Sequence, residues 1–402
     1  MSFIYALVAS PIHDPEVVDR LVAGPRGVLD RLGGTPGEPA DLVLVATGGT
    51  ERKILDAWEP RPGRPLVLVA HPDHNSLPAA LEALARIHQQ GGRGRIVYLA
   101  GDDGSAVGEA LADLAVWDRL HDLRIGLLGE PSDWLVASSP DPGVVRSTWG
   151  PEVVPIELAE VYERFRPAEA PASDGLAAAE LGKAVGLGAA IREIVARDRL
   201  DAVTLRCFDV IGDLDTTGCV ALSDLNDAGV VAGCEGDLVS TVTMIWVTEL
   251  VGEVPWMANP ARVEPGGVLW LAHCTVPTGL VDRVRHDTHF ESGRGVGLSG
   301  EFANGPVTLV RVGGAAMDRL WLAEGELVGR GHDPGLCRTQ AAIRVGEAAV
   351  SELLAAPLGN HLVMVRGHHG NRLRAWWELA VAPTGRPRIE VSREGIPLTS
   401  CL

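Results

Sequence analysis

The sequence predicts a mixed α/β protein, with two parallel-sheet α/β domains followed by a C-terminal β-rich, barrel-like domain. Short apolar runs alternate with amphipathic helical stretches through the first 130 residues, and a second such series begins at Arg124. This alternation is typical of parallel sheets covered on both faces. From about Gly266, short alternating segments separated by glycine replace the helical patterns, which indicates mostly β structure. We therefore expect domains at residues 1–123, 124–265 and 266–402.

Apolar runs rich in Val, Leu and Ile predict the strands of the first domain: Phe3–Ala9, Asp41–Ala46, Pro65–Ala70 and Arg95–Ala100. Helical stretches lie between them, among them Pro15–Leu32 and Leu77–Gln89. Ligands bind at the carboxyl ends of parallel strands. The polar clusters at Ser10–Asp14, Gly48–Glu51 and His71–Ser76 fall at such ends.

The second series contains an exposed Pro/Ala-rich loop (Arg166–Ser173), a long helix (Leu176–Arg197), a strand (Asp201–Cys207) and a buried helix (Val239–Val251). The last domain contains strands at Val307–Val312 and Arg319–Val328, interrupted by a short helix at Thr339–Leu354 and an end segment around Leu373–Ala382. No internal repeat of fixed period is evident.

The charge balance argues against several classes of partner. The formal net charge of −18 disfavours nucleic acid and anionic membranes, which require a surplus of Lys and Arg. No apolar run reaches 18 residues, so we expect no membrane span. The N-terminus lacks a basic region before its first apolar run, and the six cysteines form no CxxC pair. We therefore expect no signal peptide, reduced thiols and a cytoplasmic location.

The densest group of reactive side chains is Gly233-Cys-Glu-Gly-Asp237, where an apolar strand ends and a helix begins. Two carboxylates so close together are unfavourable unless something pairs with them. Asp237 is equally well explained as a residue that favours a helix N-terminus. Glu235 has no such explanation and lies where α/β sheets place ligand-binding groups. We therefore predict a functional role for Glu235 above all.

Histidines at two other strand ends suggest a metal centre. His273 closes the apolar run Leu269–Ala272, and His361 opens the run that ends at His368-His369. A lone His in such a position is often only a hydrogen-bonded core residue, but here several polar groups occupy strand ends. A mixed set of His and carboxylate ligands suits Mn²⁺ or another divalent ion better than structural Zn²⁺.

Two further segments combine polar residues at element edges: His289-Phe-Glu-Ser292 and Cys337-Arg-Thr-Gln340. Arg338 could bind an anionic group or pair with a carboxylate at the surface, and the sequence leaves both interpretations open. Gly48-Gly49 does not form a phosphate-binding loop, because the Lys of that motif is missing. No GxSxG motif is present.

These segments together resemble the L-fucose/L-arabinose isomerase superfamily, and most closely its short fucose-isomerase-like members. The resemblance is carried by Cys234-Glu-Gly-Asp237, Pro255-Trp-Met-Ala-Asn259, Ala272-His-Cys274 and Gly359-Asn-His361. N-terminal segments agree, namely Gly48-Gly-Thr-Glu51, Asn75-Ser-Leu-Pro-Ala-Ala-Leu-Glu82 and Gly129-Glu-Pro-Ser-Asp-Trp134. The resemblance covers almost the whole chain.

The resemblance implies two flavodoxin-like (Rossmann-like) domains, a C-terminal barrel-like domain and a site between the last two. It implies that Glu235, His273 and His361 bind Mn²⁺, with Glu235 also taking part in proton transfer. The family's second carboxylate is replaced here by Asn259, so Glu235 would act with Asp237 or Glu291. Substrate contacts are predicted for five residues: Asn259, His289, Glu291, Arg338 and Asn360.

The function implied is a metal-dependent aldose–ketose isomerase that acts on a sugar such as L-fucose or L-arabinose through an enediol, without an organic cofactor. Alternatives are an epimerase or a lyase on the same scaffold, which Asn259 favours, and a non-catalytic sugar-binding protein. Family members are homo-oligomers, often trimers or hexamers, in which the first domain of a neighbour closes the pocket. By that resemblance His13, His74 or Asn75 would contact the substrate of another subunit.

Overall fold

The computed structural model describes residues 2–58, 63–101, 103–173 and 175–382. They form two compact units, one made of the described residues up to Ala110 with Ala382, and one spanning Leu111–Val381, which we describe separately. Parallel-sheet α/β structure and a closed antiparallel β-barrel are both present, as the sequence predicts. The predicted division into three domains stays a prediction. Residues 383–402 of the predicted third domain lie outside the described part of the chain.

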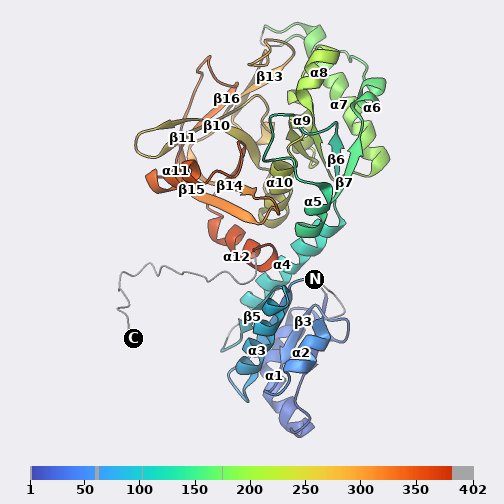
Figure 1. The fold of residues 1–402 in the computed structure, drawn as a ribbon, viewed down its shortest axis with the longest axis vertical. Helices are drawn as coiled ribbons and strands as arrows, with labels where there is room; N and C mark the ends of the chain where they lie inside the picture. The colour runs from blue at the N-terminus through green and yellow to red at the C-terminus, as the bar shows by residue number, and fades with distance from the viewer. Residues whose placement is uncertain (1, 59–62, 102, 174, 383–402) are drawn as a thin grey trace. The chain divides into compact units, whose positions relative to one another are not determined.

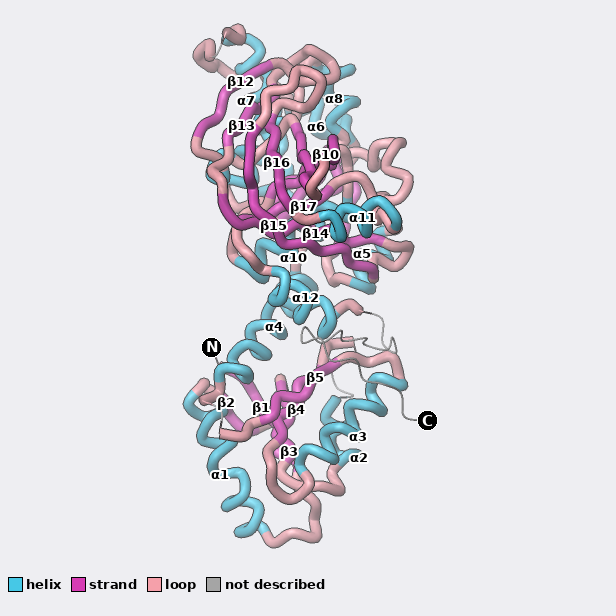
Figure 2. Tube along the Cα trace, turned by 90° about the vertical axis from the view of Figure 1, so that its left-hand side faces the viewer, coloured by secondary structure: helices cyan, strands magenta, loops and turns pink. Residues whose placement is uncertain are grey.

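The first unit contains a five-stranded parallel sheet with the order β2-β1-β3-β4-β5. This order is that of flavodoxin-like folds. Figure 2 shows α1 on one side of the sheet and α2 and α3 on the other. The strands are β1 (Phe3–Val8), β2 (Gly34–Pro36), β3 (Leu42–Val45), β4 (Leu66–Ala70) and β5 (Gly94–Tyr98). The helices are α1 (Pro15–Arg31), α2 (Glu51–Trp58) and α3 (Ser76–Gln89), and α4 (Ser105–Asp122) leads along the chain into the second unit.

The second unit begins with a four-stranded parallel sheet in the order β7-β6-β8-β9. Its strands are β6 (Arg124–Leu128), β7 (Glu152–Ile156), β8 (Ala202–Leu205) and β9 (Val231–Cys234). Its helices are α5 (Pro142–Thr148), α6 (Leu158–Arg164), α7 (Ala178–Asp198), α8 (Cys207–Leu214), α9 (Cys219–Asp227) and α10 (Leu238–Val251). These elements confirm the predicted second α/β series, including the long helix and the buried helix.

A closed barrel of six antiparallel strands follows, in the order β10-β11-β16-β15-β14-β17, with β17 pairing back to β10. The strands are β10 (Trp256–Glu264), β11 (Val268–His273), β14 (Gly305–Gly313), β15 (Arg319–Arg330), β16 (Thr339–Arg344) and β17 (Leu362–Arg366). A separate two-stranded sheet joins β12 (Arg283–Asp287) to β13 (Gly297–Glu301). The shorter helices are η1 (Thr278–Leu280), α11 (Glu347–Ala355) and α12 (Gly370–Ala380).

The predicted helix at Thr339–Leu354 is wrong in its first part. Thr339–Arg344 is strand β16, which pairs with β11 and β15 and is needed to close the barrel. Helix α11 begins only at Glu347. The alanines at 341 and 342 favour helix locally, but the ladder between two neighbouring strands outweighs that weak preference.

Helix α10 joins the parallel sheet to the barrel within the second unit (Figure 1). It is apolar on all sides, as expected for a helix buried all round, and its residues from Leu238 to Val247 are buried. Trp246 on this helix packs against Trp149 and Trp376, with ring centroids 5.3 and 5.6 Å away. This continuous core fixes the end of β9 relative to the barrel strands. None of the described helices is long and apolar enough to cross a membrane.

Candidate metal centre

The turn between β9 and α10 places two carboxylates beside the ring of His361, one near each ring nitrogen. Glu235 has a φ of +64° and Gly236 a φ of +72°, so two consecutive left-handed residues reverse the chain. A left-handed conformation costs a residue with a side chain roughly 1–2 kcal/mol. Asp237 then caps α10, because its Oδ1 accepts a hydrogen bond from the backbone N–H of Ser240 at 2.7 Å. The strained residue is thus the one for which the sequence predicts a function.

Glu235, His273 and His361 come together as the sequence predicts. Each offers one ligand atom, and the three atoms lie within 4.8 Å of one another. Glu235 follows β9, His273 ends β11 and His361 immediately precedes β17, so the group lies between the parallel sheet and the barrel. All three side chains are buried. This set of ligands fits a divalent metal ion.

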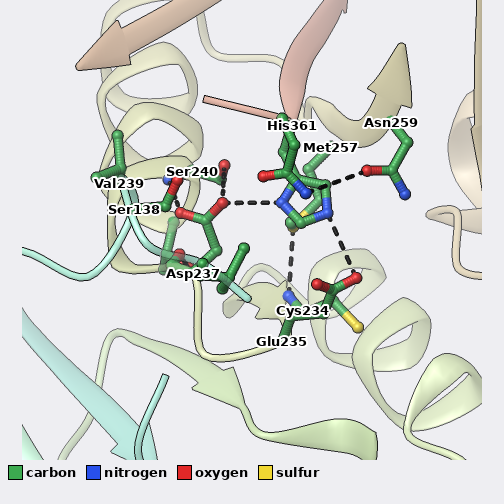
Figure 3. Close-up of polar contacts among 12 residues, drawn as sticks. Ser138, Cys234, Glu235, Asp237, Val239, Ser240, Met257, Asn259 and His361 are labelled. Atoms are coloured by element: carbon green, nitrogen blue, oxygen red, sulfur yellow. Dashed lines mark hydrogen bonds and ion pairs between the residues drawn. The ribbon is translucent and has the colours of Figure 1, made fainter. Parts of the chain in front are cut away.

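His361 presents one buried ring nitrogen to the cluster without a hydrogen bond to the described residues. Its Nε2 atom lies 3.4 Å from Oε1 of Glu235, and it forms no hydrogen bond within the described residues. Its other ring nitrogen, Nδ1, donates a hydrogen bond to Oδ2 of Asp237 at 2.8 Å. Figure 3 shows the ring between these two carboxylates. A neutral ring with its proton on Nδ1 presents the lone pair of Nε2 towards the cluster, as a metal ligand requires.

Asp237 belongs to a fully buried network behind His361. Its Oδ2 accepts a hydrogen bond from the hydroxyl of Ser240 at 2.7 Å and lies 3.5 Å from Nη1 of Arg311. Arg311, on β14, donates to Ser240 at 2.6 Å and to Ser138 at 2.5 Å. Asp237, Arg311 and His361 are each 0% exposed. The buried charge of Arg311 is therefore compensated by Asp237, as a buried charge requires.

The electrostatics of the group follow from burial and from these partners. Burial alone would lower the pKa of His361, but the hydrogen bond to Asp237 and the charge of Glu235 raise it to about 9. Burial and the charge of His361 lower the pKa of His273 to about 3. Burial opposes ionisation of both carboxylates, yet Arg311 and His361 lower the pKa of Asp237 to about 2. His361 likewise lowers the pKa of Glu235.

A small cavity of about 20 Å³ lies beside the cluster. It is lined by Glu235 and His273 and also by Asn259, His289 and Glu291, three of the five residues predicted to contact substrate. Burial, reinforced by the negative charge of Glu235, raises the pKa of Glu291. The cavity therefore contains a second carboxylate that holds a proton more readily than usual.

The two remaining predicted substrate contacts, Arg338 and Asn360, form hydrogen bonds within the chain. Arg338 donates from Nε to the carbonyl of Thr288 at 2.7 Å, and lies 3.7 Å from Asp287. Asn360 donates to Oδ1 of Asn259 at 3.4 Å. Both lie next to residues of the cavity wall, and their contact with a substrate stays a prediction.

Three groups near the cluster have no role predicted from the sequence, although Trp134 and Cys234 stand in segments that carry the family resemblance. Trp134 donates its indole N–H to Oε2 of Glu235 at 2.6 Å. Arg311 holds Asp237, and its position within the apolar strand sequence Leu309-Val-Arg-Val312 was an available signal. The sulfur atoms of Cys207 and Cys234 lie 3.1 Å apart as free thiols. The sixth cysteine, at position 401, lies outside the described residues.

In the first unit, several polar residues lie at the carboxyl end of the parallel sheet. The rings of His13 and His74 lie 5.6 Å apart, and His74 and Asn75 are consecutive left-handed residues. The predicted contact of these residues with the substrate of another subunit stays a prediction.

Comparison with known proteins finds similarity to sugar isomerases. The sulfoquinovose isomerase of Alkalicoccus urumqiensis is 28% identical over 237 residues, which cover 52% of this chain and 53% of that protein. The sulfoquinovose isomerases of Priestia aryabhattai and Priestia megaterium are each 23% identical over 225 residues, covering 50% of this chain and 49% of theirs. The chain spans about half the length of the curated relatives it matches. It matches no protein-family model.

Proposed function

We propose that this protein is a metal-dependent aldose–ketose isomerase that acts on a sugar. One observation carries the proposal: the buried Nε2 of His361, without a hydrogen bond in the described chain, faces Glu235 within a three-ligand cluster. The similarity to sulfoquinovose isomerases supports a sugar as the substrate class. L-fucose and L-arabinose, which the sequence motifs suggest, are the other candidate substrates.

The ligand set suits Mn²⁺ or another divalent ion that accepts both oxygen and imidazole ligands. When bound to Glu235, His273 and His361, such an ion would polarise the sugar carbonyl and stabilise negative charge on its oxygen. The chain's own contribution is to hold these ligands in place. Asp237 fixes the tautomer and orientation of His361, which is a positioning role.

Glu291 is the carboxylate best suited to move the proton. An isomerase must remove a proton from C2 of the aldose, which gives an enediol, and return a proton to C1. Glu291 lines the cavity with Glu235, and its raised pKa brings it closer to the working pH of a general base. Asp237 is fully buried, its oxygens are taken by Ser240 and His361, and its pKa is about 2. We therefore assign proton transfer to Glu291 acting with Glu235, rather than to Asp237.

Asn259 favours a second candidate function. It lines the cavity with Glu235, where a neutral amide can coordinate an ion but cannot act as a base. An epimerase or a carbon–carbon lyase would use the same enediolate chemistry with a different fate for the intermediate. A non-catalytic sugar-binding protein would need no proton-transfer group at all.

Incubation with Mn²⁺ in D₂O separates these functions. The purified protein is given L-fucose, L-arabinose and sulfoquinovose in turn, and products are followed by NMR. An isomerase yields a ketose, and the C2 position of recovered aldose exchanges with deuterium. An epimerase exchanges C2 but yields a second aldose, and a lyase yields shorter fragments. No exchange with any sugar, together with unchanged metal content in Glu235→Gln, would overturn the enzymatic proposals.

The proposed trimer or hexamer and the cytoplasmic location stay predictions.

A further inference from the structure

The loop that follows β6 is packed directly on the Glu235 turn. The backbone N–H of Ser132 donates to the carbonyl oxygen of Glu235 at 2.9 Å. A Cβ atom at Gly236 would lie 2.7 Å from Cα of Pro131, so the close approach of the two segments requires glycine there. Arg206 donates to the carbonyl of Pro131 at 2.6 Å and holds the loop from its other side. The turn that carries Glu235 and the loop therefore form one local structure.

Trp134 extends from this loop to the carboxylate of Glu235. Its indole N–H donates to Oε2 at 2.6 Å, a short bond of the kind that a charged acceptor gives. The edge of its ring packs against Phe208, with centroids 4.9 Å apart and planes at 83°. Trp134 is nevertheless 51% exposed, so the indole contributes little as a core side chain. Its strongest polar contact is the bond to Glu235.

Because of this bond, the two carboxylate oxygens of Glu235 have different partners. Oε2 is occupied by Trp134, whereas Oε1 lies 3.4 Å from Nε2 of His361. The backbone of Glu235 is left-handed, a conformation that persists only where surrounding contacts determine it. Ser132 supplies such a contact to the backbone, and Trp134 supplies one to the side chain.

We propose that Trp134 is a positioning residue of the candidate metal centre, whose indole N–H holds Oε2 of Glu235 so that Oε1 is presented to the ligand cluster. The inference rests on the proposed role of Glu235 as a metal ligand. Without the N–H, the carboxylate of Glu235 can rotate, and part of the binding free energy of the ion is lost in fixing its orientation again.

The test is direct titration of Mn²⁺ into the metal-stripped full chain, followed by calorimetry. Trp134→Phe removes the N–H, and it should weaken Mn²⁺ binding about 10-fold, as loss of an outer hydrogen-bonding partner of a metal ligand does. Trp134→Gln places an amide N–H the same number of bonds from the backbone, and it should bind close to the wild-type affinity. Trp377→Phe is the matched control, because the indole nitrogen of Trp377 has no hydrogen bond to any described residue.

Each outcome of these titrations bears on the positioning role of Trp134. Wild-type affinity in Trp134→Phe overturns the positioning role while leaving the proposed function intact. Equal weakening in Trp134→Gln and Trp134→Phe assigns the effect to the ring and also overturns it. A large fall in the melting temperature of Trp134→Phe contradicts it as well, because a half-exposed positioning residue contributes little to folding. A wild-type protein that binds no divalent ion overturns both this inference and the proposed function.

Discussion

Asp237 and His361 are joined by a hydrogen bond of 2.8 Å between Oδ2 and Nδ1, across 124 residues of sequence. The bond connects the N-terminus of α10 to the residue that precedes β17 of the barrel. Because Nδ1 carries the donated proton, Nε2 is left to face Glu235. One contact thus links the packing of the barrel on α10 to the orientation of a candidate metal ligand.

Asp237→Asn should destabilise the protein strongly. The substitution keeps an acceptor for His361 but removes the charge that compensates Arg311, which is 0% exposed. Leaving one member of a buried ion pair uncompensated costs about 3–5 kcal/mol. Urea unfolding of the metal-free protein measures this loss. Asp141→Asn is the control, because Asp141 also caps a helix but is exposed, and Asn caps about as well as Asp. Equal effects in the two variants would contradict the assigned role of Arg311.

Gly359→Ala should disturb the same network from the barrel side. A Cβ atom at Gly359 would lie 2.1 Å from Nη2 of Arg311, and the φ there is +148°. We expect a loss of about 2–4 kcal/mol, from backbone strain together with overpacking, and weaker metal binding. Gly346→Ala is the matched control, since its φ is +87° but no heavy atom lies within 4 Å of the new Cβ. If both variants lose the same free energy of unfolding and bind metal as tightly as the wild type, the network around Arg311 is not needed for metal binding.

Metal binding should release one proton at neutral pH. The pKa of His361 in the metal-free protein is raised to about 9 by Asp237 and Glu235 against the effect of burial, so its ring is protonated at pH 7. A metal ion needs the lone pair of Nε2 and must displace that proton. His273 contributes none, because its pKa is about 3. The apparent affinity should therefore rise about tenfold for each pH unit up to about pH 9.

Calorimetric titration at pH 7 in buffers of different ionisation enthalpy counts the released protons. A value near one is expected for the wild type. Binding without proton release would contradict the role of His361 as a ligand.

Glu291→Gln should separate proton transfer from metal binding. Because Glu291 lines the cavity but is not among the three clustered ligands, Mn²⁺ affinity should stay close to that of the wild type. Loss of a general base typically lowers kcat by about 10²- to 10⁴-fold. Glu301→Gln, whose carboxylate pairs with Arg330 at 3.3 Å, should leave kcat unchanged. Full activity in Glu291→Gln would contradict this role and assign proton transfer to another group.

The sequence predicts the members of the candidate metal cluster better than it predicts the residues that hold them in place. Glu235, His273 and His361 stand at strand ends, where parallel sheets and barrels place functional groups, and local pattern is sufficient to find them. Arg311 forms a side-chain bond to Ser240, 71 positions away, and Trp134 forms one to Glu235, 101 positions away. The apolar neighbours of Arg311 indicate that its side chain is buried, but its partner depends on how α10 packs under the barrel, which no local pattern specifies.

The measurement that tests the metal centre most directly is the number of Mn²⁺ ions bound per chain in the wild type and in Glu235→Gln. Glu235 supplies the carboxylate of the three-ligand cluster, and the amide of Gln carries no charge to attract the ion. Equilibrium dialysis with metal analysis should give one ion per wild-type chain and a fraction of that number in Glu235→Gln at the same free Mn²⁺. Equal stoichiometry and affinity in the two proteins, or no bound ion in the wild type, would contradict a metal centre at Glu235, His273 and His361.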